Sequence, residues 1–167
     1  MSRAIEPGAE RAGSSGTPAE ASLLLPVLRG LLRLGWVHQM SRAAVELPWY
    51  EKRIDLAIAG RDRLITVELK VDRWRRAIEQ AYLNRWVAEE AWVALWHAHV
   101  TPQAVQAAAD AEVGLMIVTW RTVYPVQYPG LPPRAPDAAL DDALRASAAS
   151  LRDLLSFASA YASSTLA

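Results

Sequence analysis

Two neighbouring stretches near the middle of the chain alternate apolar residues with polar or small ones, as β-strands with one apolar face do. They are separated by residues 60–63, Gly-Arg-Asp-Arg, a sequence typical of a turn. The apolar members are Ile54, Leu56 and Ile58 in the first stretch and Ile65, Val67, Leu69 and Val71 in the second. This pattern predicts a β-hairpin.

The register of the hairpin follows from its turn. If the turn is centred between residues 61 and 62, apolar residues face apolar residues and polar residues face polar ones, whereas a one-residue slip would break both faces. The pairs are then Ala57–Thr66, Leu56–Val67, Asp55–Glu68, Ile54–Leu69 and Arg53–Lys70. The register therefore predicts that Asp55 lies directly opposite Glu68.

Two carboxylates in opposed positions need compensation. Their Cβ atoms would be about 5 Å apart, and the charges would repel by roughly 3 kcal/mol at an effective dielectric constant near 20. A divalent cation between Asp55 and Glu68 is the natural candidate, since oxygen ligands suit Mg²⁺ and Mn²⁺. Lys70 lies on the same face two residues further on, so the pattern predicts an ammonium group beside the metal.

Asp55, twelve intervening residues and then Glu68-Leu69-Lys70 resembles the signature of the PD-(D/E)xK, or restriction-endonuclease-like, nuclease superfamily. The resemblance covers residues 20–120. It implies that Asp55, Glu68 and the backbone carbonyl of Leu69 bind Mg²⁺ or Mn²⁺, and that Lys70 is the catalytic lysine. The residue before Asp55 is Ile54, where the signature has proline.

Two further acidic residues are candidate metal ligands. Some members of the superfamily supply a ligand from the first helix, where this chain has Glu20, and Glu46 on the preceding strand is the competing candidate. Each also has a structural interpretation, because Glu20 suits a helix N-terminus and Glu46 suits a solvated strand edge. The sequence leaves this choice open.

The remaining periodicity predicts an α/β fold with a mixed central β-sheet flanked by helices and an extra C-terminal helix. The resemblance implies that the core of this fold is restriction-endonuclease-like. Residues 1–19 are expected to be a disordered tail, residues 121–136 a proline-rich connector, and residues 137–163 one helix that packs on the core or on a partner copy. The other expected elements are a helix from Glu20 to Leu34 ended by Gly35, a strand Ala43–Leu47 closed by Pro48, a helix Arg73–Val87, a strand Ala91–Trp96, a helix Thr101–Ala111 and a strand Val113–Thr119.

The helix that follows the Lys70 strand carries Arg76, Gln80 and Asn84 on one polar face, because they recur at four-residue spacing. That face is either solvated or borders the proposed site. Many members of the superfamily bring a glutamine from this helix to the active site, which makes Gln80 a candidate catalytic residue. The stricter Q-x-x-x-Y variant is absent, since position 84 is Asn.

The densest basic region surrounds the hairpin and the start of this helix. Guanidinium groups interleaved with an indole suit contacts to phosphates and bases. The candidate nucleic-acid-binding residues are Arg53, Arg73, Trp74, Arg75 and Arg76. Formal net charge is zero, so binding would depend on this local patch.

Composition narrows the class of protein. The 167 residues, 52% of them hydrophobic, are enough for one domain with a sizeable core, and the absence of cysteine favours a reducing cytoplasm. Neither a membrane span nor a signal-peptide core is evident.

His97 and His99 lack suitable partners nearby for a zinc site. Of the 18 lysines and arginines only Lys52 and Lys70 are lysines, so the lysine at the motif position is not one of many.

The resemblance implies a metal-dependent nuclease that hydrolyses phosphodiester bonds, with DNA as the expected polymer because most relatives act on it. The alternative is a catalytically inactive module of the same fold that binds nucleic acid or takes part in an assembly. The neutral charge, the small size and the missing Q-x-x-x-Y variant favour that alternative.

Overall fold

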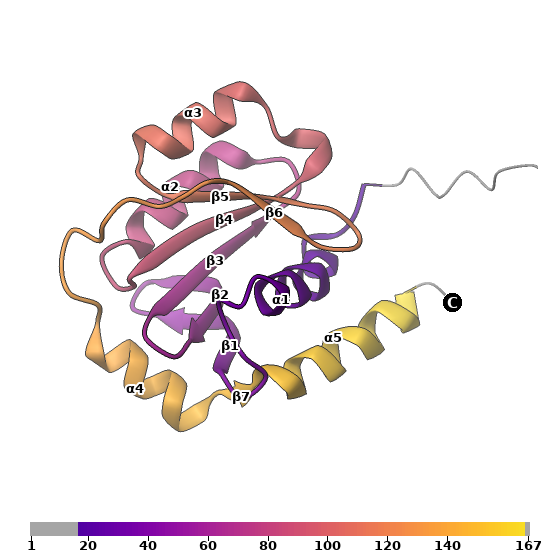
Figure 1. The fold of residues 1–167 in the computed structure, drawn as a ribbon, viewed down its shortest axis with the longest axis vertical. Coiled ribbons are helices and arrows are strands. Elements are labelled where there is room, and N and C mark those ends of the chain that lie inside the picture. Colours follow the sequence, from indigo (N-terminus) through magenta and orange to yellow (C-terminus); the bar gives the residue numbers. More distant parts are fainter. Residues whose placement is uncertain (1–16, 166–167) are drawn as a thin grey trace, which may run out of the picture.

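A seven-stranded mixed sheet in the strand order β6-β5-β4-β3-β2-β1-β7 forms the centre of the computed structural model (Figure 1), which describes residues 17–165. Residues 17–19 have no regular secondary structure, and the rest of the tail expected over residues 1–19 lies outside the described residues. The elements are η1 (Glu20–Leu23), α1 (Leu24–Arg33), β1 (Arg42–Trp49), β2 (Lys52–Ala59), β3 (Leu64–Lys70), α2 (Trp74–Asn84), β4 (Glu90–Trp96), η2 (His97–His99), α3 (Pro102–Asp110), β5 (Gly114–Val118), β6 (Val123–Gln127), α4 (Ala138–Ser147), β7 (Ala149–Ser150) and α5 (Leu151–Thr165).

The predicted mixed α/β fold is confirmed. Strands β1, β2 and β3 are antiparallel, while β3, β4 and β5 are parallel and are connected through α2 and α3. Every residue of β3 is buried, as expected for a central strand covered on both faces. Thr101 caps α3 by accepting a hydrogen bond from the backbone N–H of Ala104 at 3.2 Å. Gly35, with φ at 71°, follows α1 as predicted.

Helices cover both faces of the sheet (Figure 1). On one face α1 and α5 pack on alternate residues of the central strands, for example Val67 and Trp92. On the other face α2 and α3 pack around Val93 and Leu115. Helix α4 extends that second layer over Leu64 and the end of β2. The carboxyl ends of β3 and β4 therefore lie between two helical layers.

Strand β1 is longer than the prediction over Ala43–Leu47. It continues through Pro48, which pairs with Arg53, to Trp49, which pairs with Lys52. Proline is compatible with this position because β7 pairs with β1 only at Arg42 and Ala43, so the other end of β1 is an open edge.

The predicted connector over residues 121–136 contains a strand, so that expectation was wrong in part. Strand β6 pairs antiparallel with β5, and its Pro125 lies opposite Met116. The strand is the outermost one on its side of the sheet, where a residue without an N–H is tolerated. The prolines concealed the strand in the sequence.

The single helix predicted over residues 137–163 was also wrong. Two helices, α4 and α5, are separated by the two-residue strand β7, and Ala148 between them is extended with φ −81° and ψ 148°. Leu140 and Leu144 pack on one face of the sheet, whereas Leu151 packs on the other. Leucines that form one apolar stripe in the sequence therefore pack on two opposite faces of the sheet. The helix must be interrupted where the chain passes the edge of the sheet.

Candidate metal centre

The hairpin opens at Asp55. The ladder between β2 and β3 runs from Ala59–Leu64 to Leu56–Val67 and ends there, so the predicted register is confirmed up to that pair. Beyond it the backbone N–H of Leu69 donates to Oδ2 of Asp55 at 2.9 Å. The Asp55 carboxylate thus takes the place of a backbone partner and is fixed against the end of β3.

Strands β1 and β2 change the face to which their side chains point beside this opening, whereas Ile65, Val67 and Leu69 of β3 stay on one face. Leu56 packs with the α1 layer, whereas Ile54 packs with the α4 layer, so the prediction that Ile54 and Leu56 share a face was wrong. The β1–β2 ladder pairs Val45 with Leu56 and then Leu47 with Ile54. Glu46, the residue between the β1 partners, has a positive φ of 51°. This irregularity resets the alternation at Asp55.

Lys70 joins three groups at the end of β3. Its Nζ lies 3.2 Å from Oε2 of Glu20, 3.4 Å from Oδ2 of Asp55 and 3.1 Å from the carbonyl oxygen of Leu69. Only 8% of Lys70 is exposed. The predicted motif residues therefore converge, with Glu20 reaching them from η1.

Glu68 is the most buried carboxyl group of this centre, with 1% of the residue exposed. Burial is the largest cause that raises the pKa of Glu68 to about 7, and the charge of Asp55 adds to it. Oε1 accepts a hydrogen bond from Nδ2 of Asn84 at 2.8 Å, which opposes the shift. Oε2 is buried and has no hydrogen-bond partner. Asn84 thus holds one carboxylate oxygen of Glu68, and the other oxygen is available to a ligand.

Asn84 and Lys52 complete a network that the sequence did not reveal. Nζ of Lys52 donates to Oδ1 of Asn84 at 2.7 Å. Burial lowers the pKa of Lys52, and the charge of Glu68 partly opposes this. The rarity of lysine was the available signal, because both lysines of the chain lie around Glu68.

A pocket of about 490 Å³ adjoins Lys70 on the side of α2. Arg73, Arg76 and Gln80 line it, and Oε1 of Gln80 is buried without a hydrogen-bond partner. Gln80 and these two arginines therefore border the motif, as expected from the helix that follows β3. The pocket offers cationic and amide groups beside the carboxylates.

The other candidate nucleic-acid-binding residues, Arg53, Trp74 and Arg75, lie outside that pocket. The guanidinium of Arg75 stacks over the ring of Trp74, 4.3 Å from its centroid. Arg53 forms an exposed ion pair with Glu46 at 3.7 Å. Of the two candidates for a further metal ligand, Glu20 forms an ion pair with Lys70, whereas Glu46 forms one with Arg53.

The candidate ligand atoms are all oxygens, the type of ligand that a hard divalent cation prefers. Asp55, Glu68 and the Leu69 carbonyl offer oxygen only, and Oε2 of Glu68 lacks a partner. Residues 17–165 contain no group of three or more His, Cys, Asp or Glu side chains that could hold a metal. Mg²⁺ commonly retains several waters and is bound by a protein through one or two carboxylates.

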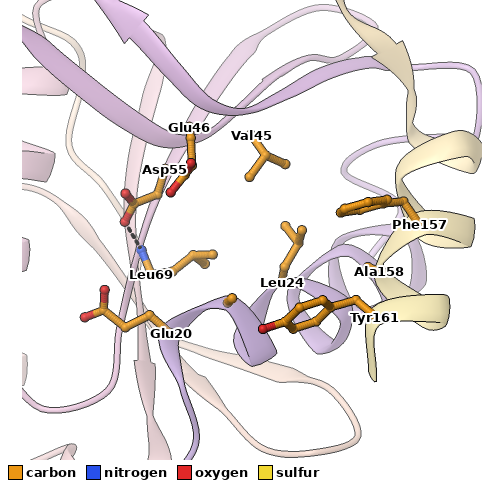
Figure 2. A pocket seen from close by; sticks show the side chains of 10 residues that line it. Glu20, Leu24, Val45, Glu46, Asp55, Leu69, Phe157, Ala158 and Tyr161 are labelled. Carbon is orange, nitrogen blue, oxygen red and sulfur yellow. Dashed lines mark hydrogen bonds between the residues drawn. The ribbon is translucent and has the colours of Figure 1, made fainter. Parts of the chain in front are cut away.

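A second pocket, of about 430 Å³, opens on the other side of Glu20 (Figure 2). Its walls come from η1, α1, β1, β2, β3 and α5. Asp55 and Leu69 lie at one end, and the rings of Phe157 and Tyr161 project from α5 at the other.

Comparison with known proteins adds a fold relative. The solved structure of SPO1766, a protein of unknown function from Silicibacter pomeroyi, superimposes with a TM-score of 0.53 at 20% sequence identity, over 74% of this chain and 79% of that chain. This likeness concerns the fold. No family model and no curated protein match the chain. Over the described residues, no helix is both long and apolar enough to cross a bilayer.

Proposed function

We propose that this protein is a metal-dependent nuclease of the PD-(D/E)xK type that hydrolyses phosphodiester bonds in DNA. The observation that carries the proposal is the convergence of Asp55, Glu68, the Leu69 carbonyl and Lys70 at the opened end of the β2–β3 hairpin. These residues are four positions of one motif, and the neighbouring strands β2 and β3 carry all of them.

The topology supports the same assignment. A hairpin that carries the motif is followed by α2 and then by β4, which runs parallel to β3. This order agrees with the restriction-endonuclease-like core that the motif implies. Asn84 occupies the position at which the Q-x-x-x-Y variant has tyrosine, and here it binds Glu68.

Each side chain has a distinct role in the proposed reaction. Asp55, Glu68 and the Leu69 carbonyl would hold Mg²⁺ or Mn²⁺, and the ion would supply polarisation of the phosphate and a water of lowered pKa. Glu68 must release its proton first, since its pKa is raised to about 7. Lys70 orients the attacking water, while Arg76 and Gln80 contact the scissile phosphate from the adjoining pocket.

The decisive experiment compares the protein with Lys70→Ala on linear, supercoiled and single-stranded DNA with Mg²⁺ or Mn²⁺. We expect metal-dependent cleavage that falls at least about a hundredfold in the variant, as is usual for loss of acid–base assistance. Arg29→Ala is the matched control, because Arg29 is an exposed cation on α1 outside the centre. Equal cleavage by all three proteins would indicate a contaminating nuclease and sink the assignment.

A second candidate is a module of this fold that binds nucleic acid without cleaving it. The pairing of Lys70 with both Glu20 and Asp55 favours it, because an ammonium group held by two carboxylates is less available to a water. Retention of DNA in a gel shift, with no cleavage under any metal, would support this module over the enzyme.

A further inference from the structure

The pocket shown in Figure 2 has two chemically different ends. Asp55 and Leu69 belong to the proposed metal centre, whereas Phe157 and Tyr161 present aromatic rings from α5. Leu24 lies between these two ends. The pocket therefore leads from the reacting groups to an aromatic surface.

The two aromatic side chains are unusually open for residues on a packed helix. Phe157 is 67% exposed and Tyr161 is 44% exposed, although Ala158 beside them is buried against the α1 layer. Helix α5 therefore packs on the α1 layer through Ala158, while a large part of each ring is exposed. An aromatic ring at the mouth of a pocket offers a flat face for a planar ligand.

Glu20 lines both pockets, so the metal centre lies between an aromatic pocket and a basic one. The basic pocket presents Lys70, Arg73 and Arg76. Each nucleotide of a nucleic-acid strand carries both kinds of group, because a sugar links an anionic phosphate to a planar base. Basic groups on one side of the metal centre suit the phosphate, and aromatic rings on the other side suit the base.

We propose that the pocket beneath α5 binds the nucleobase next to the scissile phosphate, so that the substrate is a nucleotide unpaired at the point of cleavage. This proposal rests on the proposed function for the position of the phosphate. A paired base lies inside the duplex stack and cannot enter a walled pocket unless it leaves that stack. A single strand or a frayed end therefore fits the site, and an intact duplex does not.

Binding is measured on the full-length Lys70→Ala protein with Ca²⁺, so that the result does not depend on cleavage. The probes are a single-stranded oligonucleotide that contains 2-aminopurine and the same strand in a blunt duplex. We expect the single strand to bind at least about tenfold more tightly, and Phe157→Ala to weaken it about tenfold, in line with the loss of one base–aromatic stack. The fluorescence of 2-aminopurine should be quenched on binding and recover in Tyr161→Leu.

Tyr82→Ala is the control, since Tyr82 is 42% exposed but lies on α2 outside both pockets. Unchanged affinity in Phe157→Ala, or equal losses in Phe157→Ala and Tyr82→Ala, would overturn the proposal. So would a dimer that Phe157→Ala dissociates without affecting oligonucleotide binding, because the rings would then serve self-association. Absence of cleavage by the unmodified protein, with Phe157-dependent binding of the single strand, would reject the nuclease and retain the base site.

Discussion

The side-chain amide of Asn84 donates to Oε1 of Glu68 across 2.8 Å, while the oxygen of the same amide accepts from Lys52 across 2.7 Å. An ammonium group can only donate hydrogen bonds, so Lys52 selects which end of the amide faces Glu68. The amide then holds one oxygen of the buried carboxylate and leaves the other, Oε2, for a ligand. Lys52 on β2 thus orients the amide of Asn84 on α2, and that amide orients the carboxylate of Glu68 on β3.

Replacement of Asn84 should raise the pKa of Glu68 further. In Asn84→Ala the ionised carboxylate loses a hydrogen bond of the kind that contributes about 1.5–3 kcal/mol, and about 1.4 kcal/mol corresponds to one pKa unit. We expect an upward shift of at least about one unit, measured by ¹³C NMR titration of the Glu68 carboxyl. Lys52→Met should give a smaller shift in the same direction. Gln106→Ala, which removes an exposed amide on α3, serves as control, and no shift in Asn84→Ala would contradict the network.

Glu68 should make stability fall as pH rises. Its pKa is raised from 4.5 to about 7 in the folded protein, so the folded state binds the extra proton. The contribution is fully present below about pH 4.5 and is lost as pH rises to about 7. Above that range ionised Glu68 costs about 3 kcal/mol of the free energy of unfolding.

Glu68→Gln should therefore stabilise the protein by about 3 kcal/mol near pH 8 and by much less near pH 5, as measured by urea unfolding. Exposed Glu79 on α2 provides the matched control, and Glu79→Gln should have similar small effects at both values of pH. A gain in Glu68→Gln that does not change with pH would argue against a buried titrating carboxyl.

Metal binding should depend on pH through the same group. A cation must displace the proton from Glu68, whose pKa is raised to about 7, so the affinity for Mn²⁺ should increase about tenfold between about pH 6 and pH 8. Isothermal titration calorimetry in buffers of different ionisation enthalpy would also report the released proton. Glu68→Gln should abolish most of the binding, whereas binding of equal strength in that variant would place the ion elsewhere.

The packing of α1 on β6 predicts a separate effect on stability. A Cβ added at Gly30 would lie 2.3 Å from Cγ2 of Val123 and 3.0 Å from its backbone nitrogen. Gly30→Ala should therefore destabilise the protein by about 1–3 kcal/mol, the usual range for overpacking. Val123→Ala removes the side-chain clash, so the double variant should recover part of the loss in thermal unfolding. Strict additivity of the two substitutions would show that this contact does not set the cost.

The hairpin could be predicted because its local patterns agree with one another. Turn residues and apolar alternation both fixed the register as far as Leu56–Val67, and the motif spacing placed Lys70 beside Asp55. The alternation failed at Ile54, because a positive φ at Glu46 on another strand resets the faces. No pattern within residues 53–59 reveals that event.

Other features depend on positions in the fold that a linear pattern does not report. Strand β6 can contain Pro125 because it is outermost in the sheet. The spacing of leucines in residues 137–163 suits one helix equally well as two, and pairing of β7 with β1 decides between them. Asn84 was assigned to a polar helical face, yet it is 1% exposed because Glu68 and Lys52 meet it there.

Both lysines of the chain lie around Glu68. The remaining residues of the Lys and Arg total are arginines. Among these 167 residues, Lys52 and Lys70 therefore carry the only side-chain amines for an amine-selective acylating reagent. Acylation of these two lysines consequently reports on the centre. Mass spectrometry of the acylated peptides can follow the occupancy of this one region without an introduced label.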